Sequence, residues 1–327
     1  MITKPLPSIM NHERVASEPK SQRERNMLIS QAWTASHKLF EKFDVLSVVR
    51  RLRFMASFLL HRDQLERQFG ATGPVRLRTV LAARPELLQV LIWPYIHARW
   101  SVGQRIDAIA THYQLEQVLG FPILGVQDQR VLADLDAILP TAKLVLERPH
   151  WLMREGELTL SFFQEETRIY TLSFSLGLNQ GRPAFFIGGI QGGNGENSLR
   201  LYAESTKRMH GLRPRDLMVQ CLQMLAESYR VDCIRGVSDA AHHCHGFFGG
   251  KKKNIVFRSY DEVWTDRGGS PGQDGFFSVP AVRKPYVLAD VPSKKRAMYR
   301  RRELLLESVQ ASMSDVLQGR PPHALSA

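Results

Sequence analysis

Residues 183–237 constrain the fold more than any other part of this chain. An apolar run leads directly into the glycine-rich turn 191–195, and helical spacing follows over 198–208 and 214–229. A second apolar run occupies 231–237. Because helices connect them, the two apolar runs can form parallel neighbouring strands. The stretch predicts a β-sheet with a helical crossover, and a turn whose backbone N–H groups can hold a ligand.

Two hydrophobic periods divide the rest of the chain. Helical spacing dominates residues 27–140 and includes a helix expected at 127–138. Four runs of strand-like composition follow, at 142–146, 157–163, 168–176 and 183–190. Their short connections make them antiparallel neighbours, and further strands are expected at 254–261 and 276–280. We predict an α+β fold, with a helical N-terminal part packed on a mixed β-sheet with helices.

Four regions follow from these periods. Residues 1–26 are polar and charged without an apolar period, so we expect a disordered leader there. Residues 27–140 form the helical region, and residues 141–290 form the sheet domain. Residues 291–327 are expected to form a basic C-terminal helix that ends in a disordered tail.

The segment around residues 46–59 mixes apolar residues at helical spacing with Arg50, Arg51 and Arg53. We expect this helix to pack on the domain, because its apolar side has the width of a core-facing helix. A basic amphipathic helix on a membrane surface is the alternative.

The formal net charge of +12 favours anionic partners such as nucleic acid, anionic lipid or a phosphate-bearing cofactor. A basic solvated surface without a specific partner is the alternative. The longest apolar runs are far shorter than the roughly 20 residues of a membrane span, so we predict no transmembrane segment. Three cysteines and the lack of an apolar signal at the start favour the cytoplasm.

The two turns of the central stretch are the candidate ligand-binding segments. The first contributes Gln191, Gly192 and Gly193, whose backbone can approach a phosphate closely; a plain loop that needs positive φ is the alternative. The second places cations at a helix start, where free N–H groups favour an anion. Its candidate residues are Lys207, Arg208, Gly211, Arg213 and Arg215. Glu196 and His210 lie near these turns and are the candidate catalytic acid and base.

Two further clusters have weaker implications. The run His242-His243-Cys244-His245 contains metal-ligand side chains but has no second ligand pair, so we predict no metal site. The densest basic patches could hold a polyanion, although such runs are usually solvated. These patches comprise Lys251, Lys252, Lys253, Lys294, Lys295, Arg296, Arg300 and Arg301.

Several ordered motifs resemble the VirK/YbjX family over roughly residues 45–310. They are Trp93-Pro94-Tyr95, Arg105 with His112-Tyr113, Arg154-Glu155-Gly156-Glu157-Leu158, residues 187–192, Thr206-Lys207 with His210-Gly211-Leu212-Arg213-Pro214, Tyr260-Asp261 with Trp264, and Lys294-Lys295-Arg296 with Tyr299-Arg300-Arg301-Arg302. The resemblance implies a Gram-negative bacterial protein linked to virulence or to envelope and antimicrobial-peptide resistance. It implies no reaction, so no catalytic residue is carried over.

The order of the expected elements also resembles GNAT-type acyltransferases, in which the turn before the central helix holds the pyrophosphate of acyl-CoA. Here residues 208–213 supply the arginine and first glycine of that turn, with Arg213 in place of a second small residue. The resemblance implies a GNAT-like sheet and acyl-CoA, or another phosphate-bearing donor, as cofactor. Our hypothesis is acyl or aminoacyl transfer, with an anionic donor at residues 191–195 and 210–215. A non-enzymatic protein that holds RNA or anionic lipid on its basic patches is the alternative.

Overall fold

The computed structural model describes residues 22–42, 44–70, 73–122, 125, 128–136, 138–193, 197–245 and 259–320, with side chains described from residue 27. Most of the expected leader and the end of the tail lie outside the described residues. The same is true of the candidate residues Glu196, Lys251, Lys252 and Lys253.

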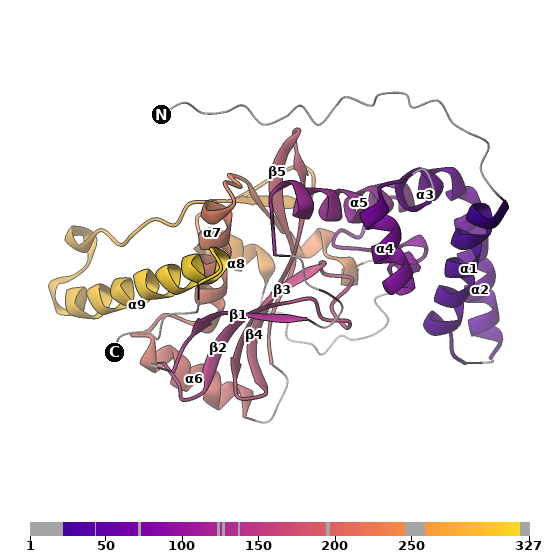
Figure 1. Cartoon of the computed structure of the whole chain (residues 1–327). Coiled ribbons are helices and arrows are strands. Elements are labelled where there is room, and N and C mark those ends of the chain that lie inside the picture. Colours follow the sequence, from indigo (N-terminus) through magenta and orange to yellow (C-terminus); the bar gives the residue numbers. More distant parts are fainter. Residues whose placement is uncertain are drawn as a thin grey trace.

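An eight-stranded sheet in the order β1-β2-β3-β4-β5-β6-β8-β7 forms the centre of the described chain (Figure 1). Its strands are β1 (Gln129–Asp134), β2 (Ala142–Glu147), β3 (Leu158–Gln164), β4 (Thr167–Asn179), β5 (Arg182–Gly192), β6 (Ile234–Val237), β7 (Ser270–Pro271) and β8 (Phe276–Val279). Strands β1 to β5 are antiparallel neighbours, whereas β6 lies parallel to β5. The predicted meander, mixed sheet and parallel crossover are therefore confirmed.

Helices gather at both sides of the sheet (Figure 1). The N-terminal part contains α1 (Gln22–Leu39), α2 (Val45–Leu60), α3 (Arg62–Phe69), α4 (Val75–Ala83), the 3-10 helix η1 (Pro85–Leu91) and α5 (Val102–Val118). The later helices are α6 (Ser198–Arg208), α7 (Pro214–Ser228), α8 (Tyr260–Asp266) and α9 (Ser293–Leu317). Helix α5 packs on β4, α7 packs on β3, β4 and β5, and α9 covers β1. In Figure 1 the N-terminal helices lie to the right of the sheet and α9 lies to its left.

The helix expected at 127–138 is wrong, because residues 129–134 form β1. Val131, Leu132 and Leu135 have helical spacing, but the segment pairs in antiparallel register with β2. Helix α9 covers the new strand: Arg130 donates a hydrogen bond to the Val316 carbonyl at 2.6 Å. Pairing and cover from elements distant in sequence override the local period.

The strand expected at 254–261 is also wrong at its described end. Residues 254–258 lie outside the described part, and Tyr260 begins α8. The Ser259 hydroxyl accepts a hydrogen bond from the Glu262 backbone at 3.2 Å, which is a helix N-cap. The cap signal outweighs the strand-like composition of the residues before it.

Helix α2 packs inward through a narrower face than we expected. Phe54 and Phe58 are buried, but most of its other large apolar side chains are exposed. Among the described helices none is both long enough and apolar enough to cross a membrane.

A buried ionic cluster fastens the helical part to the sheet. Arg84, between α4 and η1, donates a hydrogen bond to Glu157 Oε2 at 2.7 Å. The Tyr113 hydroxyl on α5 donates to the same oxygen at 2.6 Å, and the Glu157 N–H donates to Ser175 Oγ on β4 at 2.9 Å. All of these side chains are buried, so Arg84 and Tyr113 hold the Glu157 carboxylate, and Ser175 holds its backbone at the start of β3.

Candidate functional site

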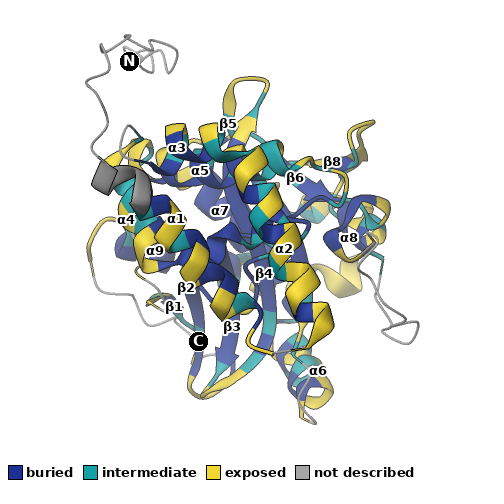
Figure 2. Ribbon diagram, turned by 90° about the vertical axis from the view of Figure 1, so that its right-hand side faces the viewer, coloured by how far each residue is buried: buried dark blue, intermediate teal, exposed yellow. Residues whose placement is uncertain are grey.

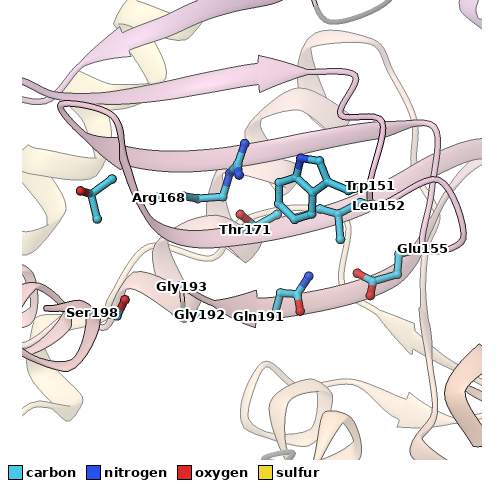
Figure 3. Close-up of a pocket in the computed structure, with 10 residues that line it drawn as sticks. Trp151, Leu152, Glu155, Arg168, Thr171, Gln191, Gly192, Gly193 and Ser198 are labelled. Atoms are coloured by element: carbon cyan, nitrogen blue, oxygen red, sulfur yellow. The ribbon is translucent and has the colours of Figure 1, made fainter. Parts of the chain in front are cut away.

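A cavity of about 470 Å³ opens where β4 begins and β5 ends, beside the start of α6 (Figure 3). It is lined by Trp151, Leu152, Glu155, Thr167, Arg168, Thr171, Gln191, Gly192, Gly193 and Ser198. Figure 3 shows Glu155 at one end of the cavity and Ser198 at the other, with Gln191 between them. This volume is in the range of small-molecule sites.

Two adjacent glycines in β5 create the space for Glu155. The β4–β5 register passes from Ser173↔Gly189 to Phe174↔Ile187, so Gly188 is an extra residue in a β-bulge. A Cβ atom on Gly188 would overlap the Glu155 backbone carbonyl, and one on Gly189 would overlap the Glu155 carboxylate. The glycines are therefore needed for the close approach of the 151–155 turn to the strand.

Glu155 is the acidic residue in the lining of this cavity, and the pKa of its carboxyl is raised. Its Oε2 atom is buried and has no hydrogen-bond partner among the described residues. Burial raises the pKa of Glu155 to about 7, and the neighbouring charge of Arg154 opposes that rise only in part. A carboxyl that exchanges its proton near neutral pH in a cavity is suited to general acid–base chemistry.

The opposite end of the cavity is the start of α6. The Asn197 side chain makes no N-cap hydrogen bond, and the first turn of α6 contains no acidic residue. Ser198 is buried, and its hydroxyl has no hydrogen-bond partner among the described residues. Free N–H groups and a hydroxyl at a helix N-terminus are suited to an anionic group such as a phosphate.

Arg168 forms part of the wall between these two ends. Its guanidinium lies 4.4 Å from the centre of the Trp151 ring, and it donates a hydrogen bond to Glu147 at 2.8 Å. The pairing with Glu147 balances its charge in part, while stacking holds the indole at the rim. Arg168 therefore supplies a fixed cation and an aromatic surface to the cavity.

A second polar group lies beside Glu155. Its member Tyr260 receives a backbone hydrogen bond from Ile190, and burial, followed by the charge of Glu155, raises the tyrosine pKa above its ordinary value. The His243 N–H donates to the Ile96 carbonyl at 3.2 Å, and Ile96 in turn donates to the Arg154 carbonyl at 2.7 Å. These contacts connect the 242–244 segment and α8 to the turn that bears Glu155.

The ligating atoms of His242, His243 and Cys244 lie within 4.8 Å of one another. His243 Nε2 is 3.3 Å from Cys244 Sγ. Burial, then His242 and Arg154, lowers the pKa of His243 to about 2, so its imidazole is neutral at physiological pH. Neutral imidazole and a cysteine thiolate are zinc ligands, but a closed structural site needs a fourth ligand, and within the described residues this group has three members.

The structure separates the two turns that we had assigned to one donor. Gln191, Gly192 and Gly193 line the cavity, whereas none of the candidates from Lys207 to Arg215 does. The turns lie at opposite ends of α6, whose 11 residues span about 16 Å. Lys207 and Arg208 are exposed at the far end of that helix.

Arg213 and Arg215 are paired with acids of the protein itself. Asp216, in the first turn of α7, lies 3.1 Å from Arg213 Nε and 3.4 Å from Arg215 Nε. Asp266 on α8 lies 2.9 Å from Arg215. The arginines at this helix start, which suggested a bound anion, thus have internal carboxylates as counter-charges.

His210 and Gly211 belong to a different surface, where the α6–α7 turn meets α9. Both have positive φ, and Arg302 on α9 donates a hydrogen bond to the His210 carbonyl at 2.7 Å. Burial, followed by Arg301 and Arg302, lowers the pKa of His210. The basic residues Lys294, Lys295, Arg300 and Arg301 are exposed on α9, while Arg296 donates to the Val291 carbonyl at 3.0 Å.

The sequence interpretation missed Glu155 and Tyr260 as members of the site. The available signal was the pair Gly188-Gly189 inside an otherwise apolar strand, which indicates a bulge or a close backbone approach. Which segment approaches the strand depends on the tertiary arrangement, and one sequence does not contain that information.

The fold and the cavity define a mixed α+β protein whose glycine-bulged strand joins a buried carboxyl to a helix N-terminus. The family model described as "Protein of unknown function (DUF535)" matches residues 45–315, and the chain belongs to this family. The resemblance to the VirK/YbjX family is thereby confirmed.

Named relatives share most of this region. The chain is 29% identical over 281 residues to "Uncharacterized protein YbjX" of Escherichia coli (strain K12), covering 83% of this chain and 84% of the relative. It is 27% identical over 222 residues to an "Uncharacterized protein" of Haemophilus influenzae, covering 67% and 73%. It is 26% identical over 212 residues to "Membrane protein LapB" of Mannheimia haemolytica, covering 63% and 90%. No solved structure matches the chain significantly.

Proposed function

We propose that this protein is an acyl- or aminoacyl-transferase whose reaction takes place in the Glu155 cavity. The observation that carries the proposal is the Glu155 carboxyl, with a buried oxygen and a pKa of about 7, across the cavity from the start of α6, where the N-cap Asn197 makes no side-chain cap hydrogen bond. One end can move a proton at neutral pH, and the other can hold the phosphates of a donor such as acyl-CoA.

The reaction assigned to this geometry is transfer from a thioester to an amine. Glu155 removes a proton from the amine as its nitrogen attacks the acyl carbonyl carbon. The carbon–nitrogen bond forms, the carbon–sulfur bond breaks, and the protonated Glu155 returns the proton to the departing thiolate. The bulge positions the reacting carboxyl, because Gly188 lies against the Glu155 backbone carbonyl and Gly189 against its carboxylate.

The sheet topology supports the proposal by analogy. A meander, a parallel strand reached through helices, and two final antiparallel strands match the order that suggested GNAT-type acyltransferases. Analogy of fold alone does not establish an activity, so the argument depends on the cavity. Relative to our first assignment, the donor site moves to Gln191, Gly192, Gly193 and Ser198.

A thermal titration of the full chain with CoA and acetyl-CoA tests donor binding. Stabilisation should increase with ligand concentration and saturate. Ser198→Ala should weaken the apparent affinity roughly fivefold, because it removes about one hydrogen bond. The matched control is Lys207→Ala with Arg208→Ala at the other end of α6, which should leave affinity unchanged.

Release of free thiol from acetyl-CoA, in the presence of a panel of primary amines, tests the chemistry. Glu155→Gln should bind the donor and lose most of the transfer, a decrease of about 100-fold or more. Stabilisation that does not saturate, or transfer that survives in Glu155→Gln, would contradict the assignment. Loss of binding in the Lys207/Arg208 variant would return the donor to the second turn.

A second candidate is a non-enzymatic protein that binds RNA. The observation in its favour is that the Arg302–His210 contact brings the α9 cations beside the turn that follows Lys207 and Arg208. Affinity for single-stranded RNA should then decrease steeply with salt, and Arg300→Gln with Arg301→Gln should reduce the salt slope. Binding that does not depend on salt would exclude this candidate.

A further inference from the structure

Helix α2 presents large apolar side chains to solvent. Val45 and Leu60, at its two ends, are 81% and 82% exposed, and Leu52 and Leu59 are 66% and 63% exposed. Leu46, Val48 and Val49 are exposed as well. Soluble proteins rarely leave so many large apolar residues together on one helix, and such a patch marks an interaction surface.

These residues form one continuous face. The spacing of residues 45, 48, 49, 52, 59 and 60 places them on the same side of an α-helix, and Phe54 and Phe58 are buried on the opposite side. Helix α2 is thus apolar on both sides: the narrow side packs on the protein, and the wider side faces outward. Figure 2 shows this helix at the surface, with much of its length exposed.

Within helix α2 the charged side chains have a single sign. No aspartate or glutamate occurs between residues 45 and 62, whereas Arg50 and Arg53 are exposed within the helix. Asp44, which caps the helix start by accepting a hydrogen bond from the Ser47 N–H at 2.7 Å, is the nearest acid before it. Neighbouring α1 adds the exposed side chains of Ile29 and Trp33. An exposed apolar face with a basic border is typical of helices that lie in a membrane interface.

We propose that the outer face of α2 docks the protein on an anionic lipid bilayer, with the helix parallel to the membrane plane. The exposed leucines and valines would enter the boundary between headgroups and acyl chains, and Arg50 and Arg53 would contact lipid phosphates. The helix has 16 residues and lies at the periphery of the molecule, so it rests on the bilayer and does not cross it. This surface is separate from the Glu155 cavity.

Charge distinguishes the bilayer from a second copy of the chain. A two-fold contact through this face would bring α2 against α2 and place arginines near arginines, with no carboxylate on either helix between residues 45 and 60 to compensate. An anionic bilayer supplies apolar and negatively charged groups in the same layer, so it complements both features of the face.

Vesicle flotation of the full chain tests this surface. The protein should float with vesicles of equal parts phosphatidylcholine and phosphatidylglycerol, and much less with phosphatidylcholine alone. Leu52→Gln with Leu59→Gln should reduce the partition roughly tenfold, and Arg50→Gln with Arg53→Gln should reduce it and remove its salt dependence. The matched control is Leu199→Gln with Leu304→Gln, which removes two exposed leucines from α6 and α9 and should not change partition.

Circular dichroism and melting temperature verify that each variant remains folded. Exposed positions are chosen so that neither pair disturbs the core. Failure of the wild-type chain to float with anionic vesicles overturns the proposal, as does equal flotation of the Leu52/Leu59 and Leu199/Leu304 variants. Light scattering then decides whether a second copy covers the face: a dimer that dissociates only in the Leu52/Leu59 variant would assign the surface to self-association.

Discussion

Glu155 and Glu157 stand on either side of Gly156, yet their environments differ in one decisive respect. Glu157 is buried, and its Oε2 accepts hydrogen bonds from Arg84 and Tyr113, which belong to other elements. Each carboxyl has one buried oxygen without a hydrogen bond among the described residues, Glu157 Oε1 and Glu155 Oε2. Glu157 is nevertheless paired with Arg84, whereas Glu155 lies at the end of a cavity without an ion pair in the described part of the chain. A buried acid with charged partners stabilises the fold, whereas a buried acid without them gains stability only when neutral or when a ligand supplies the partner.

The largest expected effect is on the structural side of this comparison. Glu157→Gln leaves the Arg84 guanidinium buried without its counter-charge, so the free energy of unfolding should fall by about 3–5 kcal/mol. Urea denaturation at pH 7 measures this change in the free energy of unfolding. The control is Glu155→Gln, the same substitution two residues earlier in the chain, which should not lower the free energy of unfolding. Equal losses of unfolding free energy in the two variants would contradict the difference drawn between Glu157 and Glu155.

The next effect concerns the pH dependence of stability. The folded-state pKa of Glu155 lies near 7, above its ordinary value of 4.5, so the folded protein holds this proton longer than the unfolded chain does. Its neutral form therefore favours folding at low pH, and stability is lost as pH rises from about 4.5 to 7.

Glu155→Gln should match the wild type near pH 4 and become more stable by about 3 kcal/mol near pH 7. Comparing the two proteins by denaturation at each pH isolates this residue from the histidines that titrate in the same window. A difference that stays constant from pH 4 to pH 8 would show that Glu155 has an ordinary pKa.

The smallest expected effect separates the two glycines of the bulge. At Gly188 a methyl group meets the Glu155 backbone carbonyl, which cannot move easily, so Gly188→Ala should cost about 2–3 kcal/mol. At Gly189 it meets the end of the Glu155 side chain, which can turn away, so the cost should be about 1 kcal/mol. Gly189→Ala should nevertheless abolish transfer, because the carboxyl is displaced. Normal transfer activity of Gly189→Ala would show that the bulge is not needed to position the Glu155 carboxyl.

Much of the fold was accessible from local patterns. The glycine turn followed by two helical periods predicted the parallel β5–β6 pair. The failures at β1 and α8 have different causes. Pairing with β2 is tertiary context that the local apolar period does not contain, whereas the Ser259 cap is a single local hydroxyl that outweighed the strand-like composition.

The candidate site was less accessible. Gln191, Gly192 and Gly193 were predicted because a glycine-rich turn directly follows an apolar run, and they line the cavity. Glu155 lies in a turn far from them in sequence, and only the folded chain brings it against Gly189. The cations at Arg213 and Arg215 were visible, but their pairing with Asp216 and Asp266 was not. The helical period of α2 was predicted correctly, and the helix packs on the protein through Phe54 and Phe58, but most of its other large apolar side chains are exposed.

A direct measurement of the Glu155 pKa decides whether this carboxyl can act as a general base at neutral pH. NMR titration of the glutamate side-chain carboxyl carbons in the full chain, assigned by the signal lost in Glu155→Gln, gives its pKa. A value near 7, which moves when acetyl-CoA is added, is the result that the buried, unpaired carboxyl predicts. A value near 4.5 that does not respond to acetyl-CoA would contradict a general base at this position.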